Sequence, residues 1–230
     1  MLGIKKILFV LFLITIGSLQ AQTVLMQESV DSVYQKNKFG VNSTHFVHTY
    51  FTFGFLFDSS NNKDVTNFGS SNSFSFGLRY KLRLTNHLAT GIELEDKFSI
   101  VAFPTHQPIL KDKYLFFDIK YAWYFRVNIG MRGDVMGKFI DMGIYGSSLF
   151  IPQHYIKKEV DNPDYKLLSY YEEDLDYFNH FSYGVLLRIG INQFIIFSEY
   201  RLNNIIKEKD SENFRSVPQV TVGLQVSLHR

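Results

Sequence analysis

The sequence contains no cysteine, which excludes disulfide bonds, thiolate metal sites and the lipid-modified cysteine of a lipoprotein. It has only one tryptophan and five prolines. Long apolar runs are almost absent as well. The stretch 7–16 is the longest, and a helix that crosses a membrane needs about twenty apolar residues. A bundle of transmembrane helices is therefore excluded.

The first residues have the pattern of an export signal. Lys5 and Lys6 precede the apolar stretch 7–16, and small or neutral residues lead up to Ala21. We therefore expect residues 1–21 to be a signal peptide that is cleaved after Ala21. Once Lys5 and Lys6 are removed, basic and acidic residues are equal in number. Because a nucleic-acid-binding protein needs an excess of basic residues, we expect no nucleic-acid partner.

The remaining chain is rich in residues that favour β-strands. The full sequence contains 23 phenylalanines, only two of them in residues 1–21, and 14 tyrosines, and its mean hydropathy is close to neutral at −0.05. Residues 22–44 are polar and are expected to form a lead-in to a single domain at 45–230. Near-neutral hydropathy is compatible with a membrane β-barrel, since only alternate residues of each strand then face lipid.

From residue 45 onward, apolar and polar residues alternate. In the segment 73–84, all even positions are apolar and all odd positions are polar or glycine. A period of two predicts β-strands with one apolar and one polar face. The pattern predicts eight strands, at 45–57, 73–84, 88–100, 114–127, 134–151, 177–190, 193–202 and 217–228.

The connections between these strands alternate in length. The short ones are 85–87, 128–133 and 191–192, and the long ones are 58–72, 101–113, 152–176 and 203–216. A barrel in a bacterial outer membrane has this arrangement, because tight turns face the periplasm and long loops face the outside. We therefore predict an all-β, eight-stranded antiparallel up-and-down transmembrane β-barrel. Its termini and the lead-in 22–44 are then periplasmic.

Alternation alone also fits a secreted, soluble barrel of the lipocalin type, in which the apolar face points inward around a ligand. Three features favour lipid on the apolar face. The polar faces carry small residues such as Gly77 and Gly91, which suit a crowded interior. A turn at 85–87 places Arg79 opposite Glu93, with Lys81 and Glu95 diagonal to them, so the charges of the polar faces can pair inside a barrel. The apolar faces are also dense in Phe and Tyr, as in the aromatic girdles of membrane barrels.

Charged residues on the polar faces are expected to fill the barrel interior. An eight-stranded barrel is only wide enough for side chains, so the charges predict a structural plug rather than a solute channel. The expected set is Arg79, Lys81, Glu93, Glu95, Asp118, Lys120 and Arg126, together with Arg188, Glu199 and Arg201.

His180 and Ser182 form the strongest enzymatic signal in the sequence. Residues two apart on a strand share a face, so the imidazole of His180 is placed to activate the Ser182 hydroxyl, with Glu199 to orient it. The pair resembles the His-x-Ser of outer-membrane lipid A deacylases. However, the alternation places both residues toward the interior, whereas such an enzyme needs them on the lipid side. The seven histidines are scattered, and we expect no enzyme activity, metal or cofactor.

The longest predicted loop, 152–176, is the candidate contact surface. Exposed tyrosines among mixed charges suit contacts with proteins or glycans. An equally good alternative is that the tyrosines pack on one another and cap the barrel. They are Tyr155, Tyr165, Tyr170 and Tyr171.

Strand number, loop alternation and the closing strand 217–228 together carry a resemblance to a known superfamily. The chain resembles the small eight-stranded outer-membrane β-barrels, which include OmpX-like, OmpA-transmembrane-like and PorT-type proteins, over residues 46–228. It departs from them in ending on Leu228, His229 and Arg230 instead of an aromatic residue. The resemblance implies a structural or interaction component, such as an accessory subunit of an outer-membrane protein assembly or secretion complex. The expected partners are outer-membrane lipid, lipopolysaccharide and other outer-membrane proteins.

Overall fold

The computed structural model describes residues 43–57, 70–105, 111–129, 137–159, 167–173, 177–207 and 216–228. The expected signal peptide 1–21 and all but the last two residues of the lead-in 22–44 lie outside these described residues. No helix in the described ranges is long and apolar enough to cross a membrane. The strands are β1 His45–Phe57, β2 Asn72–Arg83, β3 Leu88–Ala102, β4 Lys111–Ile129, β5 Lys138–Glu159, β6 Leu167–Glu173, β7 Phe181–Ile191, β8 Phe194–Arg201 and β9 Val220–Leu228.

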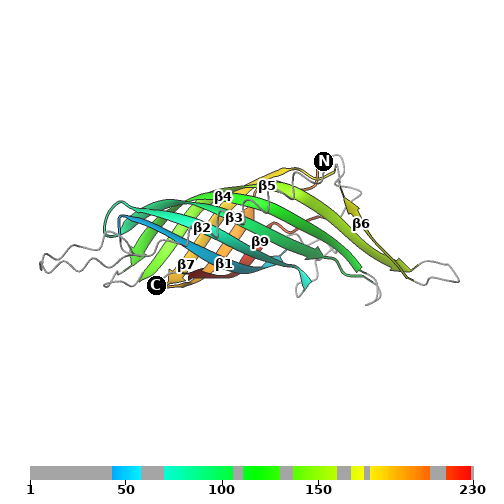
Figure 1. Cartoon of the computed structure of the whole chain (residues 1–230), viewed down its shortest axis with the longest axis horizontal. Coiled ribbons are helices and arrows are strands. Elements are labelled where there is room, and N and C mark those ends of the chain that lie inside the picture. The colour runs from blue at the N-terminus through cyan, green and yellow to red at the C-terminus, as the bar shows by residue number, and fades with distance from the viewer. Residues whose placement is uncertain are drawn as a thin grey trace, which may run out of the picture. The chain divides into compact units, whose positions relative to one another are not determined.

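Eight of these strands close into a ring. Successive strands pair antiparallel from β1 to β5, then β5 pairs with β7, and the order continues through β8 to β9. The ring closes because β1 and β9 pair antiparallel, from Thr49 opposite Leu228 to Phe57 opposite Val220 (Figure 1). This arrangement confirms the predicted eight-stranded antiparallel up-and-down barrel.

The prediction of a single loop at 152–176 is wrong. Strand β5 continues to Glu159, and β6 pairs with its last seven residues to form a hairpin beyond the ring (Figure 1). The alternation of apolar and polar residues is interrupted there by Pro152, which cannot donate a backbone hydrogen bond, and by a β-bulge next to it. At this bulge, Phe117 of β4 lies opposite Ile151 while Asp118 lies opposite Leu149, so Phe150 is the extra residue.

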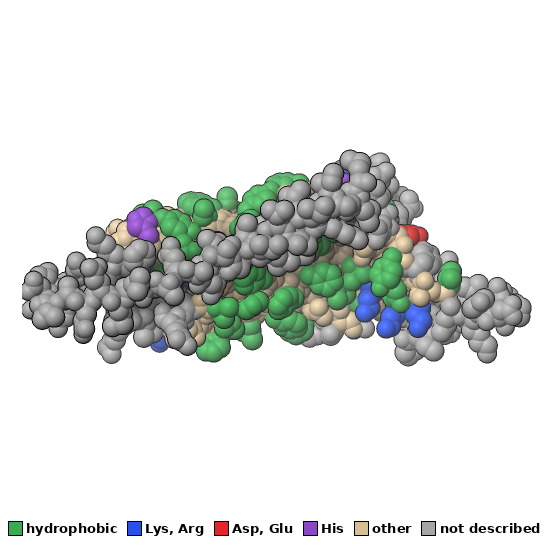
Figure 2. Space-filling view, viewed as in Figure 1, with side chains coloured by type: hydrophobic (Ala, Val, Ile, Leu, Met, Phe, Trp, Pro, Cys, Tyr) green, Lys and Arg blue, Asp and Glu red, His purple; other side chains and the backbone are tan. Residues whose placement is uncertain are grey.

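The two faces of the barrel have opposite chemistry. Large apolar side chains cover the outside (Figure 2). Ile92 on β3, Ile144 on β5 and Leu224 on β9 are 58–61% exposed, although hydrophobic residues of this kind are usually buried. Arg79 and Arg126, by contrast, are fully buried inside. A lipocalin-type carrier has the reverse arrangement, so the soluble-carrier alternative does not fit this structure.

Glycines make room for large aromatic rings inside the barrel. A Cβ atom on Gly77 would lie 2.5 Å from the ring of Tyr50, and one on Gly190 would lie 2.2 Å from the ring of Phe139. Real Cβ contacts are essentially never this short. Both rings are fully buried, so these two glycines allow an interior that is filled with side chains.

Candidate functional site in the barrel interior

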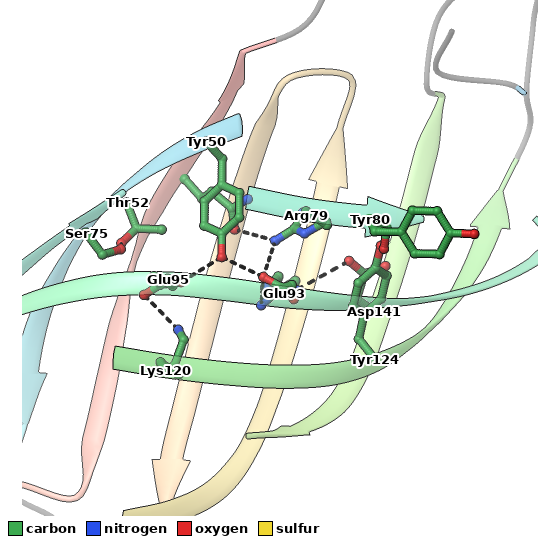
Figure 3. Close-up of polar contacts among 12 residues, drawn as sticks. Tyr50, Thr52, Ser75, Arg79, Tyr80, Glu93, Glu95, Lys120, Tyr124 and Asp141 are labelled. Atoms are coloured by element: carbon green, nitrogen blue, oxygen red, sulfur yellow. Dashed lines mark hydrogen bonds and ion pairs between the residues drawn. The ribbon is translucent and has the colours of Figure 1, made fainter. Parts of the chain in front are cut away.

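The interior is built around the carboxylate of Glu93 on β3. Arg79 of β2 donates to its Oε2 atom at 3.0 Å, and Arg188 of β7 donates to its two oxygens at 2.5 and 2.9 Å. The hydroxyl of Tyr50 on β1 lies 2.8 Å from Glu93 and 2.8 Å from Glu95, and it donates to either carboxylate (Figure 3). One carboxylate thus connects four strands through charge-assisted hydrogen bonds, which are the stronger kind.

A second ion pair lies beside the first. Arg126 of β4 donates to both oxygens of Asp141 on β5, at 2.6 and 2.8 Å. Arg188 lies 3.8 Å from Asp141, so it joins this pair to the Glu93 group. The guanidinium of Arg126 also stacks on the ring of Phe139, 3.6 Å from its centroid. Desolvated stacking of this kind stabilises a buried cation.

A third group of charges connects β3 and β4 to β8 across the interior. Lys120 lies 2.9 Å from Glu95 and also binds Glu199, and Lys97 lies 2.8 Å from the other oxygen of Glu199. Asp118 is half-buried and accepts a hydrogen bond from Ser147. Because an unpaired buried charge is costly, this mutual pairing allows so many charges to lie inside one barrel.

The arrangement agrees only in part with the pairs that the sequence predicts. Arg79 does lie opposite Glu93 in the β2–β3 register. Glu95, which was expected diagonal to Arg79, pairs with Lys120 of β4. The ammonium group of Lys81 lies 5.4 Å from the ring centroid of Phe46. The network therefore runs across the barrel as well as along the β2–β3 hairpin.

Several members of the network are missing from the predicted set, among them Lys97, which pairs with Glu199. Tyr50, Asp141 and Gln225 each contact an arginine or a carboxylate that was predicted, and each is buried. Asp141 could have been predicted as an interior residue, because it occupies an inward position of the alternation between 138 and 148. Nothing in the pattern distinguishes Tyr50 or Gln225 from other inward residues.

Apolar clusters close both ends of the interior. At the end with short turns, Phe139 and Ile195 pack with Phe46. At the end with long connections, the chain before β7 bonds to the chain after β8, with Phe178 opposite Ile206. The cluster there consists of Leu56, Val101, Phe103, Tyr114, Phe116, Phe178, Ile206 and Val217.

A cavity of about 50 Å³ lies between the Phe178 cluster, at the end with long connections, and the ion pairs. Lys97, Lys120, Ser147 and Arg201 are among the residues that line it. Since a water molecule needs about 10–15 Å³ of such volume, the cavity has room for only a few waters. Its size therefore suits a packed interior and not a path for solutes.

The candidate catalytic residues are not brought together. His180 is exposed and precedes β7, and its backbone carbonyl accepts a hydrogen bond from Leu149. Ser182 is half-buried and lines the small cavity. Glu199 binds Lys97 and Lys120, so its carboxylate is already occupied. The geometry thus lacks the hydrogen-bonded acid–base chain that an activated serine requires. Within the described ranges, no three His, Asp or Glu side chains converge as metal ligands.

The β5–β6 hairpin carries the tyrosines of the predicted contact loop. The rings of Tyr155 and Tyr171, which are cross-strand partners, lie 4.8 Å apart, and Tyr171 is 59% exposed. At the base of the hairpin, His154 lies 2.8 Å from Asp112 of β4 and 3.7 Å from Glu172 of β6. Tyr165 and the side chain of Tyr170 lie outside the described residues. Two of the four tyrosines therefore pack on one another while one of them stays accessible.

A closed ring of eight antiparallel strands with an apolar outside and a paired, charged inside defines the membrane type of β-barrel. No protein-family model matches the sequence, and no curated protein is significantly similar to it. Among solved structures, the chain is similar to Ail, the attachment invasion locus protein of Yersinia pestis. The identity is 10% and the TM-score 0.36, over 80% of this chain and 95% of Ail. The assignment of the fold rests on the strand pairings and not on this comparison.

Proposed function

We propose that the chain is an integral protein of the bacterial outer membrane that acts as a non-enzymatic structural or interaction component. The observation that carries this proposal is the contrast between the interior and the hairpin. Inside, Glu93, Asp141 and Glu199 are all held in ion pairs, so none of these three carboxylates is free to act as a catalytic acid or base. Outside the ring, the β5–β6 hairpin presents exposed Tyr171. Tyrosine offers a large, rigid contact area at low entropic cost.

The proposed orientation follows from the connections. Tight turns join β2 to β3 and β7 to β8 at one end, and the hairpin rises from the other. Outer-membrane barrels place short turns in the periplasm, so the hairpin is extracellular and both termini are periplasmic. Lys111 and Lys157 are cross-strand partners at the hairpin end, where lysine side chains can bind the phosphates of lipopolysaccharide.

We further propose that the hairpin docks the barrel onto another outer-membrane protein, as an accessory subunit of an assembly or secretion complex. The support for this proposal is that the hairpin continues a strand of the barrel. Because β5 continues through the bulge at Phe150 from Ile144 on the outside of the barrel to Tyr155, the hairpin is a direct extension of a barrel strand. A rigid contact surface loses less conformational entropy on binding than a mobile loop does.

The test begins with the location of the protein. Outer membranes should contain the chain, and it should need detergent for extraction. External protease should cut the hairpin in intact cells while the barrel survives. Recovery of the folded chain from a buffer-soluble fraction would contradict the proposal.

The second test addresses the contact. Complexes of the tagged full chain are extracted in mild detergent, and their sizes are compared for the wild type, Tyr171→Ala and Tyr183→Ala. Tyr183 is the matched control because it is 48% exposed but lies on β7 of the ring. We expect Tyr171→Ala alone to shift the chain to its free size. An equal shift in both variants, or in neither, would refute the role of the hairpin.

A further inference from the structure

One acidic side chain faces outward from the apolar surface of the barrel. Asp96 on β3 lies between Leu94 and Phe98, which are both exposed and point the same way along the strand. Across the sheet, its Cα partners are Phe76 on β2 and Ile119 on β4. Asp96 is the one carboxylate that the described strands place within this apolar surface, and no side chain of the described residues makes an ion pair with it.

The depth of Asp96 decides what can lie opposite it. Outward positions on β3 run from Leu88 to Ile100, and Asp96 is the third from the Ile100 end. A tilted strand advances about 2.5 Å along the barrel axis per residue, so Asp96 lies roughly 10 Å below Ile100 and about 20 Å above Leu88. In the orientation proposed above, with Ile100 at the outer edge of the apolar surface, this depth falls among the acyl chains of the outer leaflet.

A carboxyl group at this depth keeps its charge only beside a positively charged or hydrogen-bonding neighbour. Ionisable side chains inside membranes almost always face a protein partner or a water-filled space. A second polar group lies in the same row of the sheet, because Ile119 is paired with Ser148 of β5. The hydroxyls of Ser148 and Tyr121 lie 3.3 Å apart. Asp96 and this pair thus form a polar stripe on an otherwise apolar face.

A second copy of the chain does not supply the missing cation. A two-fold interface through this face would bring Asp96 toward its own copy, which is repulsive. The outward lysines of the described strands all lie near the strand ends, at Lys111, Lys113, Lys138 and Lys157. No copy of these strands can therefore place a lysine at the depth of Asp96.

We propose that the β3–β5 face of the barrel is covered in the membrane by a different membrane-embedded protein, whose lysine or arginine pairs with Asp96. The stripe from Asp96 to Ser148 is the contact. This inference rests on the outer-membrane location proposed above, but it does not depend on the hairpin. Charge complementarity at this depth selects one partner and disfavours others.

The test measures whether Asp96 is covered in native membranes. Dicyclohexylcarbodiimide reacts with carboxyl groups in apolar surroundings, and mass spectrometry locates the adduct. Labelling of Asp96 is compared between native outer membranes and the purified chain refolded in phosphatidylethanolamine–phosphatidylglycerol vesicles. We expect severalfold weaker labelling in the native membranes. Asp96→Asn gives the background.

The double variant Asp96→Ser with Ser198→Asp is the matched control. It moves the carboxylate to an outward position on β8, away from the proposed contact. This carboxylate should react equally in native membranes and in vesicles. Equal labelling of Asp96 itself in the two preparations would mean that acyl chains cover it, and the proposal would be wrong.

Further experiments distinguish the other groups that could cover Asp96. If EDTA restores the labelling of Asp96 in native membranes, a divalent cation covers the carboxyl group. If labelling is weak in the vesicles as well, a second copy of the chain covers it. Either outcome overturns the proposal. If the chain is missing from the outer-membrane fraction, the proposed location fails before any labelling. A photo-crosslinker at Ile119 should give a heterologous adduct in the wild type and in Asp96→Glu but not in Asp96→Asn.

Discussion

Replacing Glu93 by glutamine tests whether the interior ion pairs hold the barrel together. The carboxylate receives hydrogen bonds from Arg79 and Arg188, and both arginines are almost completely buried. Glutamine has nearly the same shape but removes the charge, which leaves two guanidinium groups side by side without their shared anion. Removing one partner of a buried ion pair costs about 3–5 kcal/mol. We therefore expect Glu93→Gln to lower the free energy of unfolding by about this amount.

The lone tryptophan provides the assay. Trp123 lies on β4, is 53% exposed on the apolar outside, and reports when the barrel leaves the lipid. Urea unfolding of the protein in lipid vesicles, followed by the fluorescence of Trp123, gives the free energy of unfolding. Glu172→Gln is the control, because Glu172 is an exposed partner of His154 at 3.7 Å. Surface pairs of this kind contribute about 0–1 kcal/mol.

A second variant separates charge from shape. Adding Arg79→Met to Glu93→Gln removes one of the two uncompensated cations, so part of the lost stability should return. If Glu93→Gln unfolds within about 1 kcal/mol of the wild type, as a surface pair would, the buried pairs do not stabilise the barrel. The reasoning about its interior would then be refuted.

Three further predictions follow from the same interior. Gly190→Val places branched carbons against the ring of Phe139 and should cost at least about 1–3 kcal/mol, whereas Val185→Ala on the outside of the same strand should fold normally. Planar bilayers that contain the purified chain should show no large, steady conductance, because clusters around Phe139 and Phe178 close the two ends; a stable open level would contradict a packed interior. Ser182→Ala should leave lipid A acylation unchanged in mass spectra of extracted lipid, since Glu199 is bound to Lys97 and Lys120, and an altered acyl pattern would restore the enzyme hypothesis.

Local pairing explains what could be predicted from the sequence. The β2–β3 turn is only a few residues long, so the register that places Arg79 opposite Glu93 follows from counting. Inward and outward positions follow from the period of two. The ring itself follows from the alternation of short and long connections.

The remaining contacts depend on how the strands are staggered around the ring. Glu199 meets Lys97 and Lys120 only because β8 faces β3 and β4 across the interior, and no local pattern encodes that distance. The hairpin was missed for a different reason. The bulge at Phe150 shifts the alternation by one residue, so a strand that continues to Glu159 looked like the start of a loop.

Pairing between β1 and β9 has a consequence for biogenesis. Thr49 and Leu228 are neighbours in space but are separated by most of the chain, so their contact has a high loop-closure cost. Until β9 is in place, the sheet has two open borders that can pair with other chains. The unfolded protein therefore has to be kept apart from other copies of itself until β1 and β9 meet.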